Sequence, residues 1–195
     1  NFSLDQHPEN HTPIPQRQRR TLPGLCELFR NTPWLMHAHN VAWFAAAVYL
    51  LTLVYRRIHE HAFAASNLRI AGTVWIPGFA ALLFLLDKNS YFPVMFVANR
   101  GFIIALCFGL LCLYEHHEWR TTKSNWRLAG SMFALGLSVL ANEGGASTLA
   151  FLISYAAVFE ARGWRNRVVS LIPATLVIAV WRVVYVAMGF GVANL

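Results

Sequence analysis

The chain has 195 residues; 56% of them are hydrophobic, 13% are charged, and the mean hydropathy is +0.43. These values are high for a soluble domain and indicate a membrane protein instead. The net charge of +7 does not point to a nucleic-acid partner, because the basic residues separate apolar stretches and do not cluster on one solvated face.

Apolar stretches with few charges fill most of the sequence. They cover residues 39–55, 70–86, 101–114, 128–141 with 146–159, and 168–192. A helix needs about 20 apolar residues to cross a bilayer core of roughly 30 Å, and several of these stretches are at or below that length. The sequence therefore predicts an all-α, multi-pass transmembrane bundle of about six segments, some of them short or re-entrant. Its expected location is a plasma or inner membrane or the endoplasmic reticulum.

Lysine and arginine gather in alternate gaps between these stretches. Nine of the eleven basic residues in the gaps belong to one group: Arg56, Arg57, Arg69, Arg120, Lys123, Arg127, Arg162, Arg165 and Arg167. Lys88 and Arg100 are the other two. Short cytoplasmic loops carry an excess of Lys and Arg, so we expect the group of nine on the cytoplasmic side. His37 and residues 87–100 and 142–145 are then expected on the opposite face.

The first 30 residues differ from the rest of the chain, being polar and rich in proline and arginine, without a signal-peptide pattern. Residues 1–30 are expected to be a flexible end or a non-cytoplasmic lead whose arginines could bind a phosphorylated ligand. Residues 31–195 are expected to form the transmembrane domain. Because the chain begins at Asn1 and ends without a polar tail, it is expected to be a fragment of a larger protein.

Ionisable residues at membrane depth are the candidate site residues, because charge is costly there. Arg182 lies in the middle of the last apolar stretch, so we expect it to face the protein interior, pair with another helix or meet a phosphate. Glu143 lies beside two glycines between two half-length apolar runs. Asp87 begins a polar corner, which continues through a short apolar piece to Arg100. Structural alternatives are a buried ion pair of Arg182 with Asp87 or Glu143, and a solvated loop for Glu143.

Histidines and cysteines give weaker signals. His37 and His39 are spaced as an HxH pair, but two ligands without a third do not indicate a metal site. His116 and His117 lie among charged residues and are expected in a solvated loop. The three cysteines have no metal-binding spacing, and the motifs of common soluble enzymes are absent. No cofactor is predicted, and a divalent metal has no support in the sequence.

Three segments carry a family resemblance. Residues 33–40 enter an apolar stretch that ends at 55–57 with Tyr-Arg-Arg; residues 83–100 run from an apolar stretch through Asp87 to Asn-Arg; residues 137–146 surround Glu143. In this order the segments resemble parts of polytopic glycosyltransferases of the C type, which use lipid-linked sugar donors, and among them the protein O-mannosyltransferases. The catalytic acid of that family follows a first helix that this chain lacks, so no catalytic residue is assigned.

The resemblance implies transfer of a sugar from a polyprenyl-phosphate donor to an acceptor on the non-cytoplasmic face. A carboxylate would act as general base on the acceptor, and a basic group would stabilise the donor phosphate. Glu143 is the candidate supporting acid, and the candidate substrate-binding residues are Arg100, Arg182, Asp87, His37 and Asn40. Arg100, Glu143 and Arg182 are expected to share one cavity. The alternative is a non-enzymatic membrane protein, transporter-like or an assembly scaffold, in which broken helices line a mid-membrane site.

Overall fold

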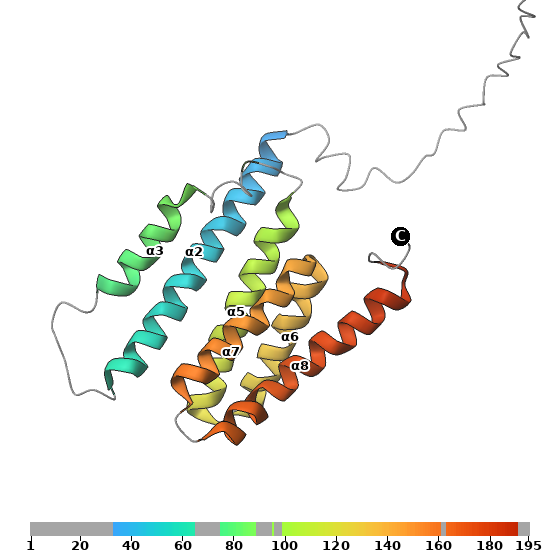
Figure 1. Cartoon of the computed structure of the whole chain (residues 1–195). Coiled ribbons are helices and arrows are strands. Elements are labelled where there is room, and N and C mark those ends of the chain that lie inside the picture. The colour runs from blue at the N-terminus through green and yellow to red at the C-terminus, as the bar shows by residue number, and fades with distance from the viewer. Residues whose placement is uncertain (1–32, 65–74, 89–94, 96–98, 161–162, 191–195) are drawn as a thin grey trace, which may run out of the picture. The chain divides into compact units, whose positions relative to one another are not determined.

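The computed structural model describes residues 33–64, 75–88, 95, 99–160 and 163–190. Within these residues the chain forms six α-helices and one 3-10 helix, with no strand (Figure 1). They are α2 (Pro33–Ala64), α3 (Ile76–Leu86), α5 (Arg100–Thr122), α6 (Asn125–Ala141), η3 (Glu143–Ser147), α7 (Thr148–Phe159) and α8 (Trp164–Ala187). The all-α fold class is therefore confirmed. The polar lead of residues 1–30 and most of the short apolar piece after Asp87 lie outside the described residues.

Two of these helices are long and apolar enough to cross a membrane. They run over Trp34–Phe63 within α2 and over Trp164–Ala187, the whole of α8. Pro173 lies inside α8. A proline in a helix interior removes one backbone hydrogen bond, which membrane helices tolerate when neighbouring groups satisfy the freed carbonyl. By length and composition, two helices of the described chain could therefore cross a membrane, and the other predicted segments form shorter or less apolar helices.

A tight reversal joins α5 to α6. Lys123, directly after α5, adopts a left-handed conformation (φ 60°) and donates its backbone N–H to the carbonyl of Trp119 at 2.8 Å. A residue in this conformation closes the last turn of a helix and redirects the chain. Only Ser124 then precedes α6, so the two helices run antiparallel side by side (Figure 1).

Small buried residues line the contact between α5 and α6. The hydroxyl of Ser138 donates to the carbonyl of Ala105 at 2.7 Å, and the hydroxyl of Ser131 donates to the carbonyl of Cys112 at 3.0 Å. All four residues are buried. Small side chains let two helices approach closely, and hydroxyl-to-backbone hydrogen bonds between helices are common in membrane proteins. This pair therefore forms the rigid centre of the described bundle.

Apolar contacts attach the other helices to the two sides of α5. One cluster of buried residues joins α5 to α6, α7 and α8; its members are Cys112, Ala134, Leu135, Leu152 and Ala174. A second cluster joins α5 to α2; its members are Ala47, Leu51, Cys107 and Leu110. α3 packs on the outer side of α2, where the rings of Phe84 and Phe44 stack with centroids 6.2 Å apart.

Consecutive helices run in opposite directions, so the helix termini gather at two ends of the bundle (Figure 1). At the end where α2, α5 and α7 finish, Arg57 Nε lies 3.3 Å from Glu118 Oε1. At the same end Arg120 Nε lies 2.6 Å from Glu160 Oε1. We call this the basic end, and the opposite end, which holds η3, the corner end. The described members of the predicted basic group thus lie together, and their location on the cytoplasmic side stays a prediction.

Candidate functional site

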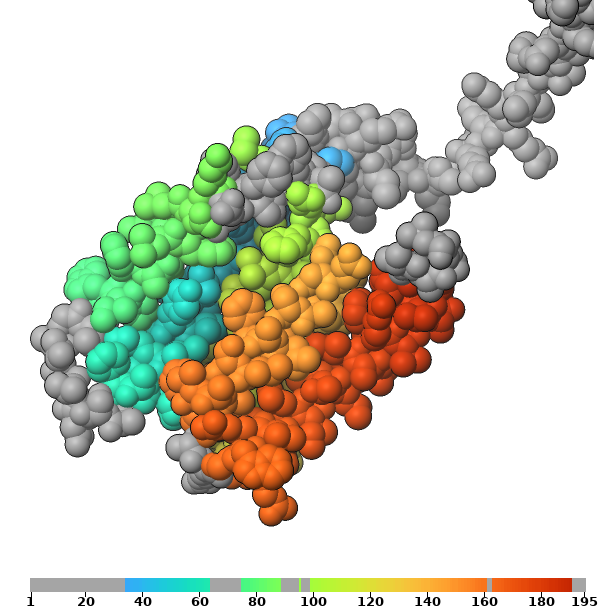
Figure 2. Space-filling model, viewed as in Figure 1, coloured from blue at the N-terminus to red at the C-terminus, as the bar shows by residue number. Residues whose placement is uncertain are grey.

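A groove of about 460 Å³ lies between α2, α5 and α7. Near the corner end it is lined by Phe102, Gly144 and Gly145, and near the basic end by Ile58 and Phe159. In Figure 2 the surfaces of α2 and α7 border a strip of α5 on the face that carries this groove. It therefore runs along the helices from one end of the bundle towards the other.

Glycine shapes the groove where η3 and α7 meet the central helix pair. A Cβ atom on Gly145 would come within 2.5 Å of the backbone of Ser138, and one on Gly109 within 2.6 Å of Thr148 Oγ1. Real Cβ atoms do not approach other atoms so closely, so only glycine allows this packing. The same positions contribute no side chain to the groove, which leaves space between α5, α7 and α2.

The described lining of the groove is apolar, with a few hydroxyl groups. Most of the wall is Leu, Val, Ile, Phe, Ala and Gly, and the polar groups are the hydroxyls of Tyr55, Ser147, Thr148, Ser154 and Tyr155. The lining includes no Asp, Glu, Lys or Arg. A groove of this size and composition can hold an apolar chain, and it offers neither a carboxylate base nor a cation.

The corner end carries a polar cluster around Tyr185. The hydroxyl of Tyr185 donates to Glu143 Oε2 at 3.0 Å, which joins α8 to the first residue of η3. The guanidinium carbon of Arg182 lies 5.7 Å from the centre of the Tyr185 ring, a cation–π distance. Asn142 positions the turn, because its side-chain oxygen accepts from the backbone N–H of Gly144 at 2.8 Å. Tyr185 therefore brings Glu143 and Arg182 together without a direct ion pair between them.

The six candidate residues from the sequence all lie at or towards the corner end. His37 is exposed and Asn40 is buried in the early turns of α2, Asp87 is exposed after α3, and Arg100 is the first residue of α5. Arg182 is exposed on α8, so burial in the interior of the described bundle is excluded for it. None of these residues, nor Glu143, lines the groove. A single cavity for Arg100, Glu143 and Arg182 therefore stays a prediction.

Two histidines expected in a solvated loop are buried instead, so that expectation was wrong. α5 continues past the apolar stretch to Thr122, and His116 and His117 keep only 1% and 5% of their surface exposed. His116 follows Gly109 and Cys112 by seven and four residues, so it continues their buried face of the helix. That spacing was the signal in the sequence, and the neighbouring charged residues concealed it.

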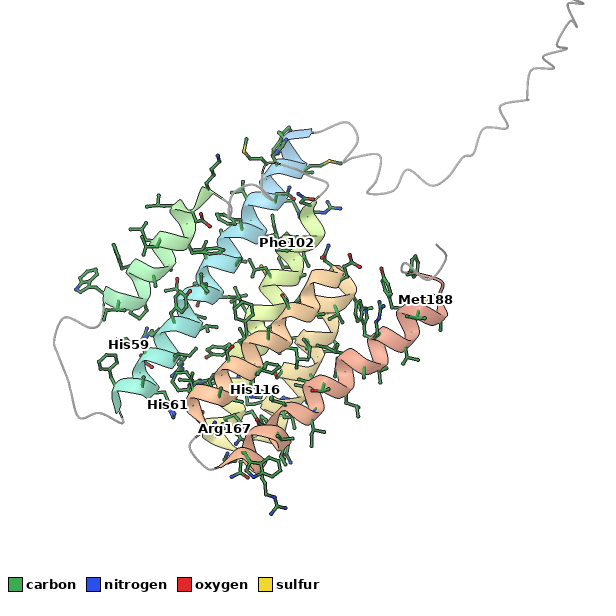
Figure 3. All side chains as sticks on the ribbon, viewed as in Figure 1. His59, His61, Phe102, His116, Arg167 and Met188 are labelled. Atoms are coloured by element: carbon green, nitrogen blue, oxygen red, sulfur yellow. The ribbon has the colours of Figure 1, made fainter. Side chains whose placement is uncertain are left out.

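Aromatic rings enclose the histidine pair. His117 Nδ1 lies within hydrogen-bond distance, 2.8 Å, of the hydroxyl of Tyr155 on α7. His61 of α2 meets the ring of His117 edge-on, with centroids 5.4 Å apart, and His116 meets the rings of Trp119 and Tyr155 in the same way. Figure 3 labels His61 and His116, both at the basic end. These contacts join α2, α5 and α7 at the basic end, next to the part of the groove that Tyr155 lines.

Burial and neighbouring charge keep the histidine pair neutral. Both residues follow the apolar stretch of residues 101–114 in the sequence. Burial is the main cause that lowers the pKa of His116 to about 4, and the charges of Arg120 and His117 contribute to this lowering. Burial also lowers the pKa of His117, with a contribution from His61 that the carboxylate of Glu118 opposes. At neutral pH the pair therefore packs as uncharged rings.

No metal centre is present in the part of the chain that the structure describes, since no three His, Cys, Asp or Glu side chains there could hold an ion together. The two features that could act on a ligand are thus the apolar groove and the polar corner around Tyr185. Comparisons with protein-family models, with curated protein sequences and with solved structures find no match to this chain.

Proposed function

We propose that this chain is a multi-pass membrane protein of the C-type glycosyltransferase kind, which binds a polyprenyl-phosphate sugar donor. In this proposal the sugar passes to an acceptor on the non-cytoplasmic face, at the corner end. The observation that carries the proposal is the apolar groove that runs from the basic end to the corner end. The resemblance of three sequence segments to that family supplies the reaction class.

The surface of the helices supports a membrane location. Valines and leucines of α8 point outward, with Leu176 62% exposed and Val183 69% exposed. Exposed apolar surface on this scale is costly in water and favourable in lipid. The packing of α5 against α6 through small residues and serine hydroxyls is also common in membranes.

The groove suits the hydrocarbon part of such a donor. Phe102 and Leu113 of α5 both line it, and eleven residues of helix extend about 16 Å. Its volume lies in the range of about 300–1,000 Å³ that is usual for small-molecule sites. An isoprenoid chain has no polar atoms to satisfy, so a lining without charged residues is appropriate for it.

The corner end suits the phosphate of the donor. Arg100 begins α5 two residues before Phe102, which lines the groove. The unpaired backbone N–H groups at a helix N-terminus and an arginine both favour an anion. Arg182, Glu143, Asp87, His37 and Asn40 belong to the same end, where they would contact the phosphate, the sugar or the acceptor. Glu143 would orient the acceptor, and the catalytic base would come from outside the described residues.

Filling the groove tests this proposal. Ser154 lines the groove, and among the described residues its hydroxyl bonds only to the carbonyl of Ala150 on its own helix, so Ser154→Trp should fill the groove without breaking a described contact between helices. Binding of a radiolabelled polyprenyl-phosphate sugar to the chain in nanodiscs should weaken at least tenfold. Arg100→Gln should weaken donor binding by a similar factor, because it removes a contact to the phosphate instead of one to the isoprenoid chain.

Thr175→Trp on α8 is the matched control, because Thr175 is also exposed and also bonds to its own helix, at the carbonyl of Leu171. It should bind the donor as the wild type does. Unchanged binding by Ser154→Trp would exclude the groove as the donor site.

The alternative function is non-enzymatic binding of an apolar ligand, in a transporter-like protein or an assembly scaffold. The absence of Asp, Glu, Lys and Arg from the described groove lining favours this alternative. It would be supported if the lipid binds in the groove while membranes that contain this protein transfer no sugar to any acceptor.

A further inference from the structure

Side chains that also belong to the histidine cluster line the groove at its basic end. Tyr155 and Phe159 of α7 line the groove, and their rings stack with centroids 5.2 Å apart. Tyr155 bonds to His117 of α5, and Phe159 meets His61 of α2 with centroids 6.1 Å apart. One small set of contacts thus joins α2, α5 and α7, which all contribute walls of the groove.

Ion pairs lie around these ring contacts at the basic end. Arg57 of α2 pairs with Glu118 of α5, and Arg120 of α5 pairs with Glu160, the residue after α7. The backbone carbonyl of Glu160 also accepts from Arg167 Nε of α8 at 2.9 Å. The carboxylates at this end are therefore already bound to arginines.

His116 lies at the centre of the same contacts without a polar partner. It is 99% buried between Trp119 and Tyr155, and among the described residues neither of its ring nitrogens has a hydrogen-bond partner. An unpaired neutral imidazole in this position is tolerated at moderate cost. A protonated one is not, because a buried charge needs a partner.

We propose that His116 makes the basic end of the groove a proton-sensitive latch. When His116 takes up a proton, its charge separates α7 from α5 and α2, and the groove opens at this end. The proposal concerns the opening of the groove and does not depend on which apolar ligand occupies it.

The groups that face the latch from each helix offer the new charge no compensation. On α5 itself these are His117, which is also a base, Glu118, and Arg120, whose positive charge opposes a second one. From α2 come Arg57, Glu60 and His61, and from α7 come Tyr155 and Glu160. α6 contributes Arg127, which pairs with Glu115, and α8 contributes Arg167. Each carboxylate among these groups is held by an arginine.

The direction of the pH effect follows from the lowered pKa of His116. The ring is neutral in the closed state down to a pH of about 4, whereas a solvent-exposed ring has a pKa of 6.5. The open state therefore binds the proton more tightly. The closed state is fully favoured above pH 6.5, and this preference is lost as the pH falls towards 4.

Spin labels on two walls of the groove test the latch. Ala62→Cys on α2 and Ala157→Cys on α7 are both exposed, near the basic end and outside the groove lining. The pair is labelled in the full chain in phosphatidylcholine nanodiscs, with the three native cysteines replaced by alanine. The distance between the labels should be constant above about pH 6.5 and should lengthen as the pH falls from there towards 4.

Two variants decide which group is responsible. His116→Phe keeps an aromatic ring but cannot be protonated, so the distance should stay short throughout. His59→Phe, at a histidine of α2 whose ring packs against Phe63 of the same helix, should follow the wild type. If the label distance in His116→Phe lengthens over the same pH range as in the wild type, protonation of the carboxylates causes the opening and the latch proposal is wrong.

A second measurement uses only the wild-type chain, so that the proposal can be tested even if His116→Phe does not fold. Ring carbon shifts of ¹³C-labelled histidine in the wild type should include one ring that titrates together with the label distance. Histidine rings that all titrate above pH 5.5 while the distance stays constant would also overturn the proposal.

Discussion

At the scale of single residues, His116 and Glu143 show how differently this chain treats its polar side chains. Glu143 is exposed and accepts a hydrogen bond from Tyr185, so its position costs little. His116 is buried without a hydrogen-bond partner among the described residues. A buried unpaired polar group costs about 1–3 kcal/mol, which the surrounding aromatic packing offsets. His116 therefore combines a cost to stability with a position next to the groove, as expected of a group that acts as a switch.

Glycines allow the closest backbone contact of the described site, and Gly145→Ala tests their importance. The new methyl group would lie within 2.5 Å of the Ser138 backbone, which cannot move without separating η3 from α6. We expect the free energy of unfolding to fall by about 1–3 kcal/mol, the usual cost of overpacking. Denaturation in mixed micelles measures this change.

Gly136→Ala provides the comparison, because Gly136 lies in α6, which η3 contacts, but has no atom within 4 Å of a new Cβ. Alanine is a better helix former than glycine, so this variant should gain roughly 0.5–1 kcal/mol. A loss in Gly136→Ala as large as that in Gly145→Ala would show that the close contact is not the cause.

At the scale of helices, the sequence predicted the order and direction of the elements better than their limits. Hydropathy located the helices, and the alternation of basic gaps gave their up-and-down arrangement. The hydropathy pattern missed the length of α5, because His116 and His117 lie between Glu115 and Glu118 in sequence while their side chains stay on the buried face. A hydropathy pattern reports average polarity and does not distinguish a buried histidine from a solvated one.

The candidate site was predictable only in part, for a related reason. Charged residues in apolar surroundings identified Arg182 and Glu143, and the structure brings them together. Tyr185, which joins them, looked like any aromatic residue of a membrane helix. The groove itself depends on the separation between α2 and α7, which is fixed by packing against α5. No local sequence pattern encodes such a distance.

The ion pair that joins α5 to the end of α7 should matter more than an exposed pair within one helix. Glu160 keeps 5% of its side chain exposed, and its partner is Arg120. Arg120→Gln would leave a buried carboxylate unpaired, so stability should fall by about 3–5 kcal/mol. Thermal unfolding in detergent at neutral pH measures the loss.

Arg56→Gln is the control for this prediction. Arg56 pairs with Glu60 four residues later on α2, and their side chains are 69% and 47% exposed. Exposed pairs of this kind contribute about 0–1 kcal/mol. Equal effects of the two variants would mean that Glu160 finds another partner when Arg120 is removed.

At the scale of the whole molecule, the two ends of the bundle should face opposite sides of the membrane. Asn125 is exposed at the start of α6, at the basic end, and Asn99 is exposed before α5, at the corner end. Asn125→Cys should react with a membrane-impermeant maleimide only from the cytoplasmic side, and Asn99→Cys only from the other, because Lys and Arg are retained in cytoplasmic loops. Labelling of both from one side would disprove the multi-pass arrangement.

The short reversal at Lys123 also bears on the order in which the chain acquires its structure. α5 and α6 touch each other almost as soon as both are synthesised, whereas the bond from Cys107 Sγ to the carbonyl of Trp43 joins residues 64 apart in sequence. Contacts between nearby residues lose less chain entropy and form sooner. The hairpin of α5 and α6 would then nucleate the fold, and α2 would dock last. Pulsed hydrogen exchange should therefore find α5 and α6 protected before α2, so that the ligand groove is the final feature to mature.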